Sequence, residues 1–445
     1  MKASIMILCL TTFTACITTP SSTNDDTSDA DAGPDQPSRR RPRVDAGPTG
    51  PGTFRFTVSG ERFAREGYPF PPAQPGAPVF VDGWEVRIDH VLVVIDKIAL
   101  WENPDKSATD PTQVDTKIAE VTGPWVVDLH LPGRGAADAG TADGGSADGG
   151  SADGGSADGG AVDAPIVIAT LGDQNLAGHI PFDETKRYAI SYEIGRASSA
   201  ARSINLDNEG TQEFLDMTAR QYSVYYIGSA TWRGTVENCP STDSQFDFSP
   251  PPRPRSGRIP RQVIFRLGFK TPTRYMNCQN PDLPGSGIGS EEHPRGVRVT
   301  SASETVVQLT VRAEQLFWEN YDGTDAPLHF DQFAIAARGA TDPTAPYRLS
   351  AAEERVGDGG ILNQNYTAFA VPWRSCSPSG YVPPDQNTRM GFQHRLYYDP
   401  LLPTSLSSTE SYRDYYDLAS HIQSGQGYLG ARGRCAVQRQ FPSRP

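Results

Sequence analysis

Two pairs of side chains in this sequence have the spacing of metal ligands. Asp128 and His130 stand two residues apart, and so do His329 and Asp331. On a β-strand, residues i and i+2 point to the same face, so each pair is expected to project from one side of its strand. Imidazole and carboxylate groups both bind divalent metals. The alternative is that both pairs are polar residues that face solvent.

Four of the six cysteines belong to the part of the chain that would remain after export. In an exported protein four cysteines predict two disulfides, which can pair in three ways. Closeness in the sequence favours Cys239–Cys278 and Cys376–Cys435. A hairpin of residues 222–236 and 261–271 would instead put Cys239 and Cys278 at opposite ends, which argues against that pairing. No CxxC pair occurs, so these cysteines are not expected to bind metal.

Motifs of the common enzyme classes are missing from the sequence. There is no phosphate-binding loop, no HExxH and no GxGxxG at a strand-to-helix turn, and Gly285–Gly289 lacks the Gly-x-Ser-x-Gly spacing of a serine hydrolase. Carboxylates are abundant, but a polysaccharide hydrolase needs two of them across one cleft, which only geometry reveals. The sequence therefore favours a role other than catalysis.

Composition excludes several further classes. The chain has 445 residues, of which 37% are hydrophobic, and a mean hydropathy of −0.47, which excludes a polytopic membrane protein. An aromatic content of 9% excludes a wholly disordered chain. The net charge of −13 argues against nucleic-acid binding, because duplex phosphates require a concentrated positive face.

The N-terminus has the features of an export signal. Residues 1–15 combine Lys2 with a short apolar run that could not span a bilayer as a helix. Phe13-Thr14-Ala15-Cys16 is similar to a bacterial lipobox, which predicts lipidation of Cys16. Acyl chains on Cys16 would give lasting membrane anchorage. Ile17, where Asp would favour the inner membrane, points to the outer membrane; the alternative is an ordinary signal peptide.

Two stretches are too polar and too rich in small residues to form a core. Residues 16–52 are rich in Thr, Ser, Asp, Pro and Gly and predict a flexible tether. Residues 133–164 contain repeats of Ser-Ala-Asp-Gly-Gly and predict a polar spacer. Strand-like sequences flank the spacer on both sides, which favours a long loop inside one domain.

The remaining sequence predicts a mainly β protein, an antiparallel sandwich of the immunoglobulin-like kind, with few short helices. Short runs rich in Val, Ile, Thr and aromatic residues alternate with Gly, Pro, Asn and Asp. Strands are predicted near 52–59, 84–100, 124–131, 165–171, 187–194, 222–236, 261–271, 303–311 and 330–337. Helices are predicted near 211–220, 349–355 and 411–423.

Three places in the sequence resemble a family of uncharacterised bacterial lipoproteins, many of them from myxobacteria. They are Gly60-Glu61 with Val81-Asp82-Gly83-Trp84-Glu85-Val86 and Asp96-Lys97-Ile98; Leu316-Phe317-Trp318 with Phe330-Asp331 and Phe333-Ala334; and His421 with Gly425-Gln426-Gly427 ahead of Cys435. In the third place the family has Gly-Glu-Gly, which this chain has altered. The resemblance implies a lipoprotein with a β domain, and it implies no particular activity.

These observations predict five parts of the chain: a signal peptide at 1–15; a lipidated cysteine and disordered tether at 16–52; a β-sandwich domain at 53–235 with the spacer at 133–164; further strands packed on it at 236–340; and a loop-rich region with short helices at 341–445.

We expect a lipid-anchored cell-envelope protein, at the outer membrane or cell surface, with a non-enzymatic structural, adhesion or binding role and no cofactor. Its expected partners are the membrane, through the anchor, and an envelope protein or polysaccharide, with no nucleic acid. One alternative is an extracytoplasmic protein that binds a divalent metal through Asp128, His130, His329 and Asp331. The other is a polysaccharide hydrolase.

Overall fold

The computed structural model describes residues 52–131, 165–172, 182–206, 210–235, 238–239, 261–318, 327–336, 347–349, 376, 397–398, 411–412 and 415–441. All of them belong to one unit of the chain, residues 44–445. The predicted signal peptide, the predicted tether before Gly52 and the predicted spacer 133–164 lie outside the described residues. No helix within the described ranges is long and apolar enough to cross a membrane.

The first sheet has five strands, in the order β16-β15-β11-β1-β5. β1 and β11 are parallel, and the other neighbours are antiparallel. The strands are β1 (Phe54–Ser59), β5 (Ile166–Leu171), β11 (Thr305–Val311), β15 (Gly427–Leu429) and β16 (Gly433–Arg434). The sheet therefore joins the first described strand to strands from the far end of the chain.

The second sheet has ten strands, with β12-β9-β8-β2-β6-β10-β17 along its main path. β3 and β4 also pair with β2, and β7 pairs with β4. The strands are β2 (Trp84–Trp101), β3 (Lys117–Val121), β4 (Trp125–Asp128), β6 (Ala189–Ile194), β7 (Arg202–Ile204), β8 (Val224–Trp232), β9 (Gln262–Phe269), β10 (Thr273–Met276), β12 (Tyr347–Leu349) and β17 (Ala436–Arg439). A separate pair consists of β13 (Tyr397–Tyr398) and β14 (Ser411–Tyr412).

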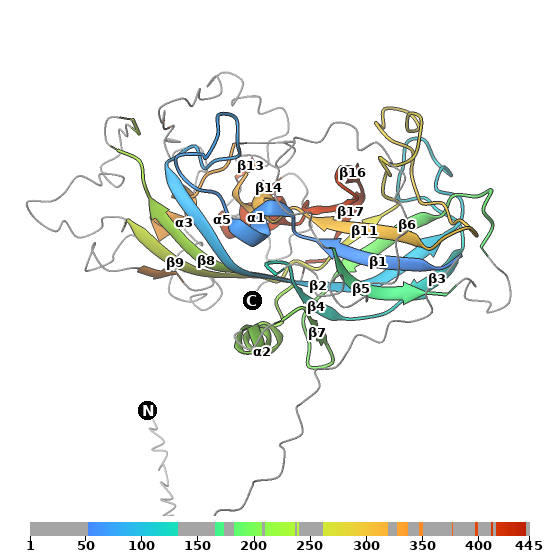
Figure 1. Cartoon of the computed structure of the whole chain (residues 1–445), viewed down its shortest axis with the longest axis horizontal. Helices are drawn as coiled ribbons and strands as arrows, with labels where there is room; N and C mark the ends of the chain where they lie inside the picture. Colours follow the sequence, from blue (N-terminus) through green and yellow to red (C-terminus); the bar gives the residue numbers. More distant parts are fainter. Residues whose placement is uncertain are drawn as a thin grey trace, which may run out of the picture. The chain divides into compact units, whose positions relative to one another are not determined.

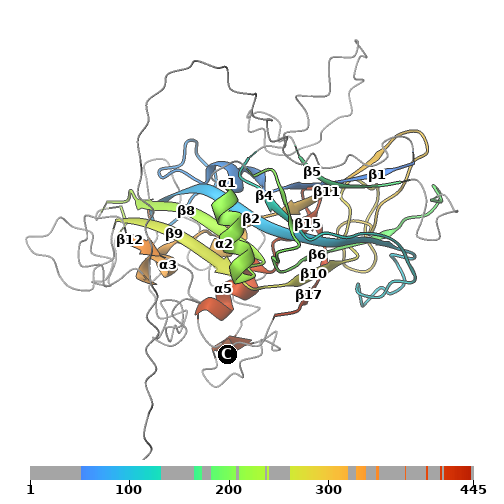
Figure 2. The same ribbon diagram turned by 90° about the horizontal axis from the view of Figure 1, so that it is seen from below.

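The main core lies between the two sheets, and the helices are short. They are α1 (Glu61–Glu66), α2 (Gly210–Arg220), the 3-10 helix η2 (Ala313–Phe317), α3 (Asp331–Ala336) and α5 (Tyr415–Gln423). α2 lies across the outer face of the second sheet (Figure 2), where Met217 closes a smaller core with Leu92, Val94, Tyr225 and others. The predicted mainly β sandwich with few short helices is thus confirmed.

The long strand β2 changes the side it presents to the main core twice. Its pairing shifts between Ile88 and His90 against β8, and again between Asp96 and Ala99 against β6, where Lys97 has a φ of 47°. Each bulge reverses the alternation of side chains. Even-numbered residues therefore face the main core first, then odd-numbered ones, then even-numbered ones again: Trp84, Val86 and Ile88; Val91, Val93 and Ile95; Ile98 and Leu100.

Eight of the nine predicted strands are present, and the ninth, at 330–337, is wrong. This segment forms the helix α3, because Phe330, Phe333 and Ala334 have helical spacing and all three are buried in the main core. The helix predicted at 211–220 is confirmed as α2, and the one at 411–423 is confirmed over Tyr415–Gln423. The helix predicted at 349–355 lies outside the described residues except for Leu349, which ends β12.

All four cysteines predicted to be bridged form disulfides, but the pairing favoured by closeness in the sequence is wrong. The bonds are Cys239–Cys376 and Cys278–Cys435. β8 and β9 do form the predicted hairpin, which leaves Cys239 beyond its closed end. Cys278 follows β10 at the other end, so the two cannot meet. Each disulfide instead joins parts of the chain more than a hundred residues apart.

Candidate functional site

Asp82 and Trp84, at the start of β2, hold the beginning of helix α3. One carboxylate oxygen of Asp82, Oδ2, accepts hydrogen bonds from the backbone N–H groups of Phe330 (2.7 Å) and Asp331 (2.8 Å). The indole N–H of Trp84 donates to Oδ1 of Asp331 at 2.8 Å. A carboxylate at this position satisfies N–H groups that have no partner within the helix and complements the positive end of its dipole.

His329 and Asp331 therefore do not project from one face of a strand, which corrects the sequence interpretation. They stand at the start of α3, where Asp331 is its first residue. His329 is buried, and its Nδ1 lies 3.7 Å from Oδ2 of Asp82. The pair thus faces Asp82, a residue that the sequence analysis included only in a family resemblance.

Gly83 fits between this polar group and a disulfide. Its φ is +90°, and a Cβ atom there would lie 2.8 Å from Sγ of Cys376 and 3.0 Å from Sγ of Cys239. Only glycine combines that backbone conformation with so close an approach. The two residues before Gly83 also accept hydrogen bonds: the backbone N–H of Cys376 donates to the carbonyl of Val81 at 2.6 Å, and the indole of Trp232 donates to the carbonyl of Asp82 at 3.1 Å.

Asp128 and His130, the other predicted pair, lie next to His90. Asp128 is fully buried at the end of β4, and its Oδ2 is 2.7 Å from Nδ1 of His90 on β2. The backbone N–H of His130 donates to Oδ1 of Asp128 at 3.0 Å, while its ring Nδ1 donates to the carbonyl of Ala64 at 3.2 Å. The rings of His90 and His130 are 6.1 Å apart. His90 follows the first bulge of β2, so the alternation of residues 84–88 gave no signal for its position.

The structure places each predicted pair with its own partners. Asp128 and His130 pack against His90 and α1, whereas His329 and Asp331 pack against Asp82 and Trp84. Within the described ranges, no group of three or more His, Cys, Asp or Glu side chains is arranged to hold a metal ion. Each of the four side chains contacts a residue that is distant in the sequence.

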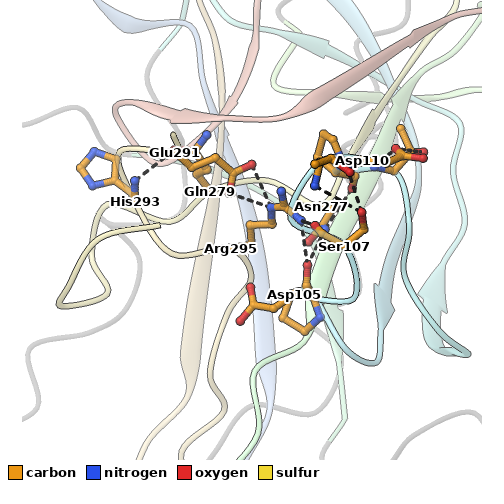
Figure 3. Close-up of polar contacts among 12 residues, drawn as sticks. Asp105, Ser107, Asp110, Asn277, Gln279, Glu291, His293 and Arg295 are labelled. Carbon is orange, nitrogen blue, oxygen red and sulfur yellow. Dashed lines mark hydrogen bonds and ion pairs between the residues drawn. The ribbon is translucent and has the colours of Figure 1, made fainter. Parts of the chain in front are cut away.

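A third polar group lies around Arg295, which is only 1% exposed (Figure 3). Its Nε donates to both carboxylate oxygens of Glu291, at 2.9 and 2.7 Å. Its Nη1 donates to the carbonyls of Pro104 (3.3 Å) and Ser107 (2.8 Å), which belong to the loop between β2 and β3. Arg295 therefore joins that loop to the one that follows β10.

Two neighbouring side chains, Asn277 and Arg187, also bind the loop between β2 and β3. Asn277, with a φ of 48°, donates to the carbonyls of Pro104 (2.7 Å) and Pro111 (3.0 Å). Arg187 donates to the carbonyl of Arg295 at 2.7 Å and forms an ion pair with Asp105. Hydrogen bonds to charged groups are stronger than those between neutral groups, so these contacts fix both loops in place. Composition and spacing gave no sign of this group.

A fourth group fills the interior next to α5 and includes the third segment of the family resemblance. Tyr226 donates to Oε1 of Gln426 at 2.8 Å, and Tyr275 donates to the carbonyl of Ser424 at 2.7 Å. Thr271 donates to Oε1 of Gln423. Burial raises the pKa of Tyr226 well above its ordinary value, so it stays a neutral donor. The turn after α5 is thus held by side chains of the second sheet.

Comparisons with known proteins found no relative of this chain. No family model matches the chain, no curated protein matches it, and no solved structure matches it.

Proposed function

We propose that this protein is a lipid-anchored component of the cell envelope with a structural, adhesion or binding role and no enzymatic activity. The observation that carries the proposal is the lipobox-like sequence that ends at Cys16. The resemblance to bacterial lipoproteins supports it. Localisation at the outer membrane or cell surface is part of the proposal.

The disulfide-bonded body supports the same proposal. Two disulfides join remote parts of the β-sandwich, and such bonds persist in oxidising compartments outside the cytoplasm. The side chains of Asp82 and Arg295 bind backbone atoms of distant segments, and the carboxylate of Asp128 binds the ring of His90 on another strand. These contacts are consistent with a rigid body whose surface would bind an envelope protein or a polysaccharide.

Replacement of the anchoring cysteine tests the proposal. Cys16→Ser in the full chain is expected to abolish acylation, measured by mass spectrometry, and to move the protein from the membrane fraction to the soluble fraction. Cys9→Ser is the matched control, because Cys9 lies within the predicted signal peptide and should have no effect. The proposal fails if Cys16→Ser leaves acylation and fractionation unchanged.

A further inference from the structure

β1 is the first strand after the predicted tether, and it is bonded along both of its edges. Phe54 to Ser59 pair in parallel register with Thr305 to Thr310 of β11. On the other edge, Phe54 to Val58 pair with β5 in antiparallel register. Figure 1 shows the three strands side by side, with α1 beyond the end of β1. β1 therefore cannot leave the sheet without breaking two ladders of hydrogen bonds.

The buried side chains of β1 also stabilise its position in the sheet. Phe54, Phe56 and Val58 are at most 1% exposed and point into the main core. The ring of Phe54 also packs edge-on against Phe182, with ring centroids 5.0 Å apart. Removing β1 would expose these apolar side chains to water, which is unfavourable in proportion to their area.

The start of β1 is fastened to the segment that leads into β11. The backbone N–H of Gly52 lies 3.0 Å from the carbonyl of Thr300 and 3.2 Å from that of Ser303. Arg55 forms an ion pair of 2.7 Å with Glu304. Because β1 and β11 are parallel, both strands begin at this end of the sheet. A pull transmitted through residues 16–52 reaches the body here.

The opposite end of the sheet is where the C-terminal part of the chain joins the body. Val311, the last residue of β11, pairs with Gly427, and Thr310 pairs with Tyr428, which in turn pairs with Arg434. Cys435, next in the chain, is bonded to Cys278. A pull on the C-terminus first loads β17, which pairs with β10, and then reaches the body covalently through this disulfide, near the end of β11.

We propose that β1 and β11 form a tension clamp, through which the tether passes force from the membrane anchor to the body. This rests on the proposed anchoring at Cys16. When the start of β1 is pulled away from the far end of the sheet, the hydrogen bonds of its parallel ladder are loaded together and must break together. A pull that separates the starts of β1 and β11 loads them one after another. The two disulfides close the loops 239–376 and 278–435, so β1 lies outside both, and its resistance comes from the ladders.

Single-molecule force spectroscopy in two pulling directions tests the clamp. The full mature chain carries Ser at position 16 and a handle at its N-terminus, with both disulfides intact. The second handle is placed either at the C-terminus or on an Ala302→Cys variant, because Ala302 is an exposed residue beside the start of β11. The same bonds hold β1 in both cases. The C-terminal handle also separates β17 from β10, an event that is distinguished from the release of β1 by the shorter length of chain it frees.

We expect the rupture that releases β1 to require a force about two-fold higher or more with the C-terminal handle, since forced unfolding follows the barrier along the pulled direction. Equal or lower force with the C-terminal handle would overturn the clamp. This result does not depend on lipidation, so it is distinguishable from a failure of the Cys16→Ser experiment. If the force difference is found but Cys16 is not acylated, the proposed lipid anchor is wrong and the mechanical resistance of β1 still holds.

Discussion

Replacing Arg295 by methionine removes the charge that joins two loops of the second sheet. In the native protein Arg295 is 1% exposed, and it donates to both oxygens of Glu291 and to the carbonyls of Pro104 and Ser107. The carboxylate of Glu291 is itself only 17% exposed. Arg295→Met removes the hydrogen bonds of this carboxylate and of the Ser107 carbonyl to Arg295, while the Pro104 carbonyl keeps its hydrogen bond from Asn277.

The expected cost follows from that geometry. Breaking a buried ion pair by removing one partner destabilises a protein by about 3–5 kcal/mol, because an uncompensated charge stays behind. Lys106→Met is the matched control in the same loop, where the ion pair with Asp115 is 42% and 40% exposed. Exposed pairs contribute about 1 kcal/mol or less. We therefore expect Arg295→Met to be clearly the more harmful of the two.

Denaturant unfolding followed by tryptophan fluorescence, with the disulfides intact, measures both variants. The midpoint should fall strongly for Arg295→Met and little for Lys106→Met, with similar slopes. Adding Glu291→Gln to Arg295→Met should recover part of the loss, since the stranded charge is then gone. Equal midpoints for Arg295→Met and Lys106→Met would refute the reasoning.

Three further predictions concern other parts of the body. Gly83→Ala should reduce formation of the disulfide of Cys376, because its Cβ would lie 2.8 Å from that sulfur; free thiols counted under denaturing conditions measure this, and unchanged counts would contradict it. Asp82→Asn should destabilise the protein by about 1–2 kcal/mol through a weaker cap on α3, measured by thermal unfolding. Burial raises the pKa of Tyr192 and Tyr226 well above the ordinary 10.0, so their contribution to stability is complete below that pH and is lost as the pH rises above it. A spectrophotometric titration should show these two phenols ionising only on alkaline unfolding, and reversible ionisation in the folded protein would disprove it.

The predicted metal-ligand pairs show what residue spacing can and cannot tell. The short apolar segment around His329 and Asp331 predicts a strand, yet Phe330, Phe333 and Ala334 repeat with helical spacing. Short apolar runs fit both patterns, and tertiary contacts decide between them. Here the carboxylate of Asp82, almost 250 residues away in the sequence, caps the helix.

In the strand β2, too, tertiary contacts decide a feature that residue spacing does not show. Its length and its apolar run from Val91 to Ile95 were visible in the sequence. The first bulge, which turns Leu92 and Val94 toward α2, and the second, which reverses the alternation again, were not visible, because a bulge is set by pairing with neighbouring strands. His90 therefore met Asp128 in a position that alternation alone did not reveal.

The sequence by itself determined the class of fold, most strand positions, the helix α2 and the four cysteines that form disulfides. These depend on local composition and on the spacing of apolar residues, which a short window of sequence contains. Only the tertiary structure decided the disulfide pairing, the helix at Asp331 and the buried contacts of Arg295. Each of these depends on which distant segments meet when the two sheets pack, and no local pattern of residues encodes that meeting.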